Sequence, residues 1–224
     1  KFYKNYTEFL YKKGCFDNYV GANIKCIRIF FTYIKQEKDI MAGDFHKEFY
    51  VRKQELPVLV LSPEQLKFLI HDKIFESQLT ITQRKIKDIF VFGCTTGLRY
   101  SDVFLITNKN IEQSGEDWYL NVTSKKTKTN TSVKLPSYAV EIILKYKSKS
   151  ARKTLFTKTD LSNFNRILKI IGEKAGWTKE VEISREQQGV AQKVNYAKEK
   201  TRFCDNMSSH IMRRTAITTL LILG

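Results

Sequence analysis

Apolar side chains recur at helical spacing in two stretches near the start of the chain. The stripes consist of Phe2, Tyr6, Phe9 and Leu10, followed by Val20, Ile24, Ile27, Phe31 and Ile34. The segment from Gly14 to Asn18 separates them, and Asp17 or Asn18 is a candidate cap for the second helix. Two helices are too few for a complete domain. We therefore expect residues 1–40 to be the C-terminal part of a helical domain.

The next segment, residues 41–61, is polar with scattered aromatic residues, and it ends in Pro57 and a strand-like run from Val58 to Leu61. We expect an extended interdomain linker here. The run SPEQ at residues 62–65 is typical of a helix start, because serine caps, proline suits the first helical position and glutamine completes a capping box. A second domain is therefore predicted over residues 62–224.

Helical and strand patterns alternate within this second domain. Strand character over residues 118–122 and 132–135 flanks a polar turn, and Pro136 ends the ladder. Residues 179–203 are polar with interspersed β-branched residues, which predicts a further hairpin, and a last helix is expected to start at Ser208 or Ser209. Helical spacing occurs at Leu66, Leu69, Ile70 and Ile74, at Ile86, Ile89, Phe90 and Val91, at Val140, Ile143 and Leu144, and at Phe164, Ile167, Leu168 and Ile171. The pattern predicts a mainly α fold with a small antiparallel β-sheet.

The formal net charge of +16 over 224 residues favours a polyanionic partner. Nucleic acid is the first candidate, and an anionic membrane surface is the second. No apolar run approaches the roughly 20 residues that a spanning helix needs, and no signal-peptide pattern opens the chain. We therefore expect a soluble protein of the cytoplasm with no membrane partner.

The cysteine and histidine residues do not have metal-site spacing. Cys15, Cys26, Cys94 and Cys204 form no CxxC pair, and His46, His71 and His210 are not spaced to complete a zinc site. Reduced, mostly buried thiols are the expected state. Glycine-rich phosphate loops and HExxH patterns are also absent from the sequence. We therefore expect chemistry that needs neither a metal nor another cofactor.

Two basic clusters precede the last helix. The first, TTGLRYSD at residues 95–102, places Gly97 in a tight turn after a buried helix, so that Arg99 extends from a rigid base. Asp102, three residues further on, is a candidate partner that orients the Arg99 guanidinium. The second cluster, KKTKT at residues 125–129, lies in the turn between the two predicted strands.

The third basic cluster is SSHIMRRT at residues 208–215. If the helix starts at Ser208 or Ser209, His210 and Arg213 share a face. They also lie in the first turn, where free N–H groups favour a phosphate. Each cluster alone is a weak signal, since a single arginine on a basic protein is usually a solvated surface residue. The order of all three along one chain makes the signal strong.

In this order the clusters resemble the motifs of tyrosine recombinases, the phage integrase family. The matching segments are TTGLRYSD, a turn lysine eight residues before Pro136, and SSHIMRRT. The resemblance covers essentially the whole chain: residues 1–40 resemble the end of the helical core-binding (SAM-like) domain, and residues 62–224 resemble most of the catalytic domain. The long segment between Trp177 and His210 is similar to integrases of mobile elements from Bacteroides-type bacteria.

The resemblance implies a site-specific DNA recombinase (integrase) that cuts and rejoins DNA through a 3′-phosphotyrosine intermediate, without ATP or metal. Arg99 and Arg213 match the two arginines that clamp the phosphate in planar, paired fashion. The general acid is the turn lysine, which is Lys128 by counting from Pro136, with Lys126 as the alternative. His210 matches the position that hydrogen-bonds the phosphate and assists proton transfer.

The resemblance also implies partners and surrounding contacts. Double-stranded DNA is the expected partner, with a tetramer assembled on paired DNA sites and a location at the nucleoid. Lys125, Lys126 and Arg214 are expected to bind DNA.

Two departures from the family pattern stand out. Arg214 occupies a position where many members have a second histidine, so it is given no catalytic role. The sequence also ends before the position of the nucleophilic tyrosine, and the 224 residues alone are therefore expected to be inactive in strand cleavage. Tyr100 and Tyr196 lie upstream of His210 and are interpreted as packing or DNA-contact residues.

Two alternatives remain open at the level of sequence. A type IB topoisomerase uses similar chemistry, although the two-helix segment before residue 41 favours a recombinase. A catalytically idle DNA-binding protein of the same fold also accounts for the charge, because phosphate neutralisation needs no catalysis. The ordered set of Arg99, Lys128, His210 and Arg213 argues against it.

Overall fold

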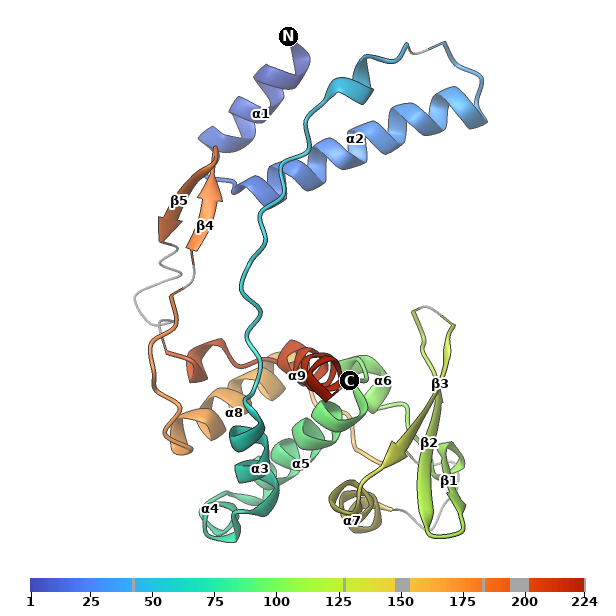
Figure 1. Cartoon of the computed structure of the whole chain (residues 1–224), viewed down its shortest axis with the longest axis vertical. Helices are drawn as coiled ribbons and strands as arrows, with labels where there is room; N and C mark the ends of the chain where they lie inside the picture. The colour runs from blue at the N-terminus through green and yellow to red at the C-terminus, as the bar shows by residue number, and fades with distance from the viewer. Residues whose placement is uncertain (42, 127, 148–153, 183, 194–201, 224) are drawn as a thin grey trace. The chain divides into compact units, whose positions relative to one another are not determined.

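The computed structural model describes the chain except for residues 42, 127, 148–153, 183, 194–201 and 224 (Figure 1). Its residues form two compact units. Unit 1 comprises Lys1–Pro57 and Val181–Lys198, and unit 2 comprises Val58–Glu180 and Glu199–Gly224. The predicted fold class, mainly helical with small antiparallel sheets, is confirmed. Of the helices in the described part of the chain, none is long and apolar enough to span a membrane.

Unit 1 contains the two helices predicted for residues 1–40, together with a hairpin. Its elements are α1 (Phe2–Lys12), α2 (Asp17–Glu37), the 3-10 turn η1 (Phe45–Glu48), β4 (Ser184–Gln187) and β5 (Val190–Lys193). β4 and β5 are the antiparallel pair predicted within residues 179–203. This hairpin belongs to unit 1 together with α1 and α2, whereas the sequence pattern predicted it as part of the second domain.

Asp17 attaches the hairpin to the helices of unit 1. Its side chain does not cap α2, because the N-cap residue is Phe16. The buried carboxylate instead accepts hydrogen bonds from the backbone N–H groups of Gln188 and Gly189, both at 2.8 Å, and from the Tyr11 hydroxyl at 2.8 Å. Gln188 and Gly189 have φ of 57° and 79°, as the tight turn of a two-residue hairpin requires. Burial and the Asp17 carboxylate raise the pKa of Tyr11, which keeps its proton available for this bond.

Replacing Asp17 by alanine is expected to release the turn at Gln188 and Gly189. Hydrogen bonds to a charged acceptor contribute about 1.5–3 kcal/mol each, so protection of these two amides against hydrogen exchange should fall at least about tenfold. Exchange measured by NMR checks this. Asp44→Ala is the control, because Asp44 forms only exposed ion pairs with Lys35 and Lys47 in the described contacts. Unchanged protection in Asp17→Ala would show that another contact holds the hairpin.

Unit 2 consists of helices packed around α5 and one three-stranded sheet. The sheet is antiparallel in the order β1-β2-β3, and the pair Thr123–Asn130 closes the ladder next to a turn at residues 124–129. The elements are α3 (Pro63–His71), α4 (Lys73–Ser77), α5 (Ile81–Thr96), α6 (Tyr100–Val103), η2 (Asn108–Asn110), β1 (Ile111–Ser114), β2 (Asp117–Thr123), β3 (Asn130–Leu135), α7 (Ser137–Tyr146), α8 (Leu161–Lys174), η3 (Cys204–Asn206) and α9 (Ser209–Leu223).

Capping residues define where α3 begins. The Ser62 hydroxyl accepts from the Gln65 N–H at 3.2 Å, and the Gln65 side chain accepts from the Ser62 N–H at 2.9 Å. This is the predicted capping box, with Pro63 in the first helical position. The strand-like run from Val58 to Leu61 belongs to no sheet. The backbone N–H of Leu61 instead donates to the Thr215 hydroxyl of α9 at 3.0 Å, which fixes the start of unit 2 against its last helix.

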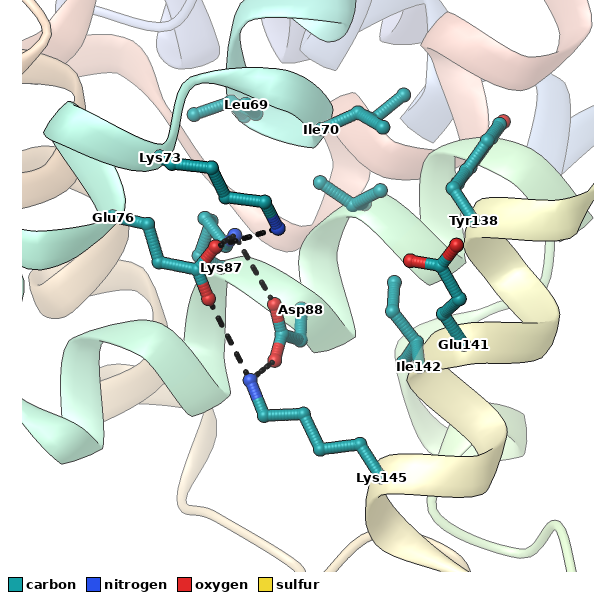
Figure 2. A pocket seen from close by; sticks show the side chains of 11 residues that line it. Leu69, Ile70, Lys73, Glu76, Lys87, Asp88, Tyr138, Glu141, Ile142 and Lys145 are labelled. Carbon is teal, nitrogen blue, oxygen red and sulfur yellow. Dashed lines mark hydrogen bonds and ion pairs between the residues drawn. The ribbon is translucent and has the colours of Figure 1, made fainter.

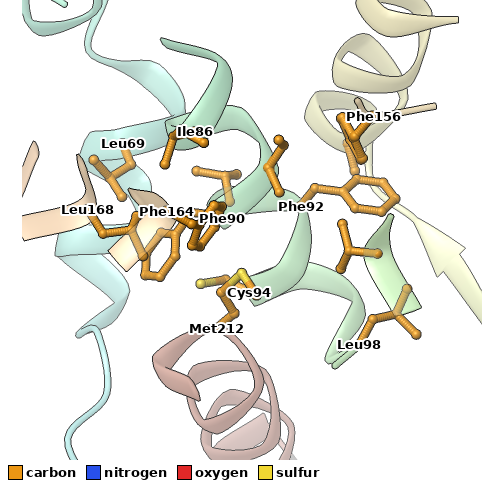
Figure 3. Packing of buried hydrophobic residues seen from close by; sticks show 14 of the residues in the cluster. Leu69, Ile86, Phe90, Phe92, Cys94, Leu98, Phe156, Phe164, Leu168 and Met212 are labelled. Carbon is orange, nitrogen blue, oxygen red and sulfur yellow. The ribbon is translucent and has the colours of Figure 1, made fainter. Parts of the chain in front are cut away.

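Helix α5 forms the centre of unit 2 and packs against α7, α8 and α9. Figure 3 shows its buried side chains: Phe90 lies near Phe164 of α8 and Met212 of α9, whereas Phe92 points toward Phe156. Gly93 lets α9 approach closely, since a Cβ at this position would lie 3.1 Å from the Cβ of Met212. This close packing fixes the axis of α9, on which Arg213 follows Met212 directly.

A group of charged side chains lies where α4, α5 and α7 meet. Figure 2 shows Glu76, Lys87, Asp88 and Lys145 beside a small cavity of about 100 Å³. Lys87 and Asp88 are each only 4% exposed, and their side chains are 3.3 Å apart. Asp88 also accepts from Lys145 at 2.7 Å and from the Tyr146 hydroxyl at 2.8 Å. The ion pairs and the hydrogen bond therefore compensate the burial of both charges.

Candidate functional site

The turn after α5 positions the first candidate arginine. Gly97 has a φ of 66°, as predicted for a tight turn, and its N–H donates to the Gly93 carbonyl at 3.0 Å. The buried Leu98 anchors the turn, and the half-buried Arg99 follows as the N-cap residue of α6. Arg99 therefore extends from a segment that is fixed on both sides.

Hydrogen bonds connect Arg99 to Asp102 through a residue that the sequence analysis missed. The Arg99 Nη1 donates to the Ser124 Oγ at 2.8 Å, and the Ser124 Oγ donates to the Asp102 Oδ2 at 3.4 Å. Asp102 is 5% exposed, as expected for a residue with a structural task. Asp102 was expected to orient Arg99 directly, but in the described contacts it acts on Arg99 through Ser124. In the sequence, the one indication of this role is that a serine directly precedes the lysine cluster.

The turn between β2 and β3 carries the candidate lysines. The Ser124 N–H donates to the Thr129 carbonyl, and the Lys128 N–H donates to the Ser124 carbonyl, both at 2.9 Å. Lys128 has a φ of 57°, which is uncommon for a residue other than glycine. Lys125, Lys126 and Lys128 are all exposed. Because Ser124 contacts Arg99, the lysine turn begins next to the first arginine.

Helix α9 brings the second candidate arginine to the same place. It begins at Ser209, as predicted, and the Ser209 N–H donates to the Asn165 side chain of α8 at 2.9 Å. The half-buried Arg213 donates from Nη1 to the Gly97 carbonyl at 2.8 Å. Arg99 and Arg213 therefore meet at one turn, although 114 positions separate them in sequence. No sequence pattern indicated Asn165.

His210 and Arg214 flank Arg213 on the same helix. Both are exposed, and His210 lies one turn before Arg213, so the two side chains emerge from neighbouring positions on α9. Hydrogen bonds thus link Arg99 to the lysine turn through Ser124 and hold Arg213 on the Gly97 carbonyl, two residues before Arg99. His210 lies at the start of the helix that carries Arg213. The catalytic and DNA-binding roles of these residues stay predictions.

The tyrosine next to Arg99 is a packing residue. Tyr100 stacks edge-on against Phe104 and Phe164, and its hydroxyl donates to the Thr159 carbonyl. Burial, followed by the nearby Asp160, raises the pKa of Tyr100. Both effects disfavour a phenolate nucleophile at this position. Tyr196 lies outside the described residues.

Two further observations concern metals and thiols. Within the described residues, no group of three or more His, Cys, Asp or Glu side chains is arranged to hold a metal ion. All four cysteines are free thiols; Cys94 and Cys204 are buried, Cys15 is half-buried and Cys26 is exposed. Burial raises the pKa of the Cys94 thiol, so this side chain stays protonated inside the core.

Comparison with protein-family models and with curated protein sequences finds no match. Solved structures do match. A Tn1549 transposon integrase in complex with circular intermediate DNA aligns with a TM-score of 0.58 and 15% identity, over 99% of this chain and 72% of that chain. XerH recombinase bound to a palindromic difH substrate aligns with a TM-score of 0.64 and 17% identity, over 97% of this chain and 61% of that chain. At these identities the likeness shows the fold: this chain has the fold of tyrosine recombinases and integrases.

Proposed function

We propose that this chain is part of a site-specific DNA recombinase that cuts and rejoins DNA through a 3′-phosphotyrosine intermediate. The observation that carries the proposal is the meeting of Arg99 and Arg213 at the Gly97 turn, next to the lysine turn of the β2–β3 hairpin. A fold alone hosts many functions, so the proposal rests on this arrangement of side chains. The shared fold with recombinases solved on DNA agrees with it.

The two arginines suit a phosphodiester under attack. A pentavalent phosphate gathers negative charge on its non-bridging oxygens, and a guanidinium offers five N–H donors in a planar fork. In the described contacts Arg99 gives one side-chain hydrogen bond to Ser124, and Arg213 gives one to Gly97. Each hydrogen bond orients its guanidinium and leaves further donors for phosphate oxygens. The two residues would thus form the phosphate clamp.

The remaining roles follow from exposure and position. The leaving 5′-oxygen needs a proton, which an exposed lysine on the β2–β3 turn supplies: Lys128 in the first instance, or Lys126. His210, in the first turn of α9, hydrogen-bonds the phosphate and assists proton transfer. Lys125, Lys126 and Arg214 bind the DNA backbone around the reacting phosphate.

The larger assembly is part of the same proposal. Residues 1–40 act as the end of a core-binding domain, residues 41–61 as a linker, and residues 62–224 as most of the catalytic domain, from which the hairpin β4–β5 extends into unit 1. The partner is double-stranded DNA, recombination takes place in a tetramer on paired sites, and the protein works at the nucleoid.

Duplex DNA binding is expected to weaken steeply with salt. Each neutralised phosphate adds about 0.9 to the slope of log affinity against log salt concentration, so replacing Lys125, Lys126 and Lys128 together by alanine should lower the slope by about 2–3. Lys134→Ala is the matched control, because Lys134 lies further along β3 and is paired with Asp117 at 2.6 Å. Fluorescence titrations at several salt concentrations measure the slope. A flat slope for the unsubstituted chain would assign its positive charge to a partner other than DNA.

Covalent trapping tests the chemistry itself. Residues 214–224 contain no tyrosine, so the test compares the 224-residue chain with a protein that extends beyond Gly224 as far as a tyrosine. On a nicked duplex whose cleaved fragment diffuses away, the extended protein should form a 3′-phosphotyrosyl adduct, seen on a denaturing gel. A catalytically idle binder of the same fold would bind this duplex and form no adduct. A type IB topoisomerase would form the adduct and relax supercoiled DNA without joining two sites.

A further inference from the structure

We infer that Ser124 is a positioning residue that holds the lysine turn against Arg99, so that one residue sets the positions of both the general acid and the phosphate clamp; this inference rests on the proposed function. Ser124 follows β2 directly and is the first residue of the turn at 124–129. It is half-buried, whereas the described residues Lys125, Lys126, Lys128 and Thr129 are exposed. Ser124 is therefore the point where the exposed turn is attached to the body of unit 2.

The side chain of Ser124 contacts Arg99 and Asp102, and its backbone contacts the lysine turn. The hydroxyl accepts from Arg99 at 2.8 Å and donates toward Asp102 at 3.4 Å. Its N–H donates to Thr129, and its carbonyl accepts from Lys128, both at 2.9 Å. The same residue thus closes the turn that carries the lysines and connects this turn to the first arginine. A shift of Ser124 would move both groups together.

Asp102 gives the arrangement a fixed base. Its side chain is buried on α6, and the Asp102 N–H donates to the Arg99 carbonyl at 2.9 Å, which ties the carboxylate to the backbone of the arginine it serves. A charged acceptor polarises the Ser124 hydroxyl, and this makes the hydroxyl oxygen a better acceptor for the Arg99 guanidinium. These hydrogen bonds run from the Arg99 guanidinium to the Ser124 hydroxyl and from there to the Asp102 carboxylate. They use one described side-chain donor of Arg99, and its other N–H groups remain for a phosphate.

The position of the turn depends on the residues at its base. Its described side chains are three lysines and a threonine, all exposed, and Lys128 has the left-handed φ of 57°. Exposed polar residues contribute few packing contacts, so the turn is held by hydrogen bonds at its base, among them those made by Ser124. A displacement of about 1 Å in a catalytic group is enough to lower a rate by roughly 10²-fold.

The neighbouring Thr123 provides a matched control. Its hydroxyl donates to the Asn130 side chain at 2.6 Å, across the same hairpin end, and it is exposed. Thr123→Ala therefore removes a hydroxyl and one hydrogen bond from the same hairpin without touching Arg99. Ser124→Thr is the conservative variant, because it keeps a hydroxyl at the site.

The first measurement does not depend on cleavage. In the 224-residue chain, Ser124→Ala should raise the hydrogen-exchange rates of the Lys128 and Thr129 amides and the amplitude of their fast motions by NMR relaxation. Ser124→Thr and Thr123→Ala should leave the Arg99 side-chain N–H signals in place, whereas Ser124→Ala should shift them. If neither the turn amides nor the Arg99 signals change in Ser124→Ala, the inference fails whether or not the protein cleaves DNA.

The second measurement uses the extended protein and two nicked substrates, one with an ordinary phosphodiester and one with a sulfur atom at the 5′-bridging position. A thiolate leaves without a proton, so loss of the general acid is masked on the second substrate. Lys128→Ala, or Lys126→Ala if that lysine is the acid, should be slow on the first substrate and close to normal on the second. Arg99→Ala should be slow on both.

Ser124→Ala should combine the two defects. We expect its trapping rate to fall by about 10²-fold on the ordinary substrate and to recover in part on the sulfur substrate. Ser124→Thr and Thr123→Ala should remain within a few-fold of the unsubstituted protein. An unchanged rate in Ser124→Ala, or an equal loss on both substrates, would overturn the coupling to the lysine turn. Absence of any adduct with the unsubstituted extended protein would count instead against the proposed function.

Discussion

Replacing Arg213 by alanine is expected to lower the rate of covalent DNA attachment by about 10²–10³-fold, the usual loss when one preorganised donor to a developing oxyanion is removed. The reason is positional: α9 packs against α5 through Gly93, and the Gly97 carbonyl holds the Arg213 guanidinium in one direction. Arg213→Lys should also be slow, because a lysine cannot reproduce the paired, planar donors. Single-turnover trapping of the extended protein on the nicked duplex measures the rate.

Arg214→Ala is the matched control for this loss. Arg214 is the next residue of α9 and carries the same charge, but it is exposed, whereas Arg213 is half-buried, and it has no described contact at the Gly97 turn. Its replacement should lower the salt slope of DNA binding by about one phosphate contact, roughly 0.9, with a small change in trapping rate. Arg99→Ala should behave like Arg213→Ala. Equal trapping rates in Arg213→Ala and Arg214→Ala would remove Arg213 from the phosphate clamp.

Much of unit 2 could be predicted because its signals are local. The helix start at Ser62 depends on four consecutive residues, and the tight turn at Gly97 depends on one glycine after a buried helix. The positions of Arg99 and Arg213 were also predictable, but only through the order of motifs shared with a known family. Spacing within this sequence alone does not bring together residues that lie so far apart.

The parts that could not be predicted depend on contacts between distant segments. Ser124 is one polar residue in a polar turn, and its task becomes visible only once the turn lies beside Arg99. The hairpin β4–β5 was expected, yet its attachment to unit 1 depends on Asp17 and on the Gln54 side chain, which accepts from the Glu186 N–H at 2.8 Å. Such pairings carry no periodicity, so a pattern along the chain cannot show them.

Replacing Asp88 by alanine is expected to destabilise unit 2 by about 3–5 kcal/mol, as when one partner of a buried ion pair is removed. Stability is lost because the groups that Asp88 contacts stay buried after it is removed. Lys87 is 4% exposed and would keep, among its described contacts, only Glu76 at 3.4 Å. Tyr146 would lose the acceptor of its hydroxyl; burial and Asp88 raise its pKa, so the hydroxyl keeps its proton. Both groups would be left in a protein interior without adequate partners.

Urea denaturation followed by tryptophan fluorescence measures this loss for unit 2 alone, because Trp118 and Trp177, the two tryptophans of the sequence, both lie in unit 2. The double variant Lys87→Met with Asp88→Leu removes both charges and should recover much of the stability, since apolar residues of similar volume replace a buried pair at little cost. Glu141→Ala, an exposed carboxylate beside the same cavity, is the single-charge control and should change little. A loss below about 1 kcal/mol in Asp88→Ala would mean that water or Glu76 compensates Lys87 without Asp88.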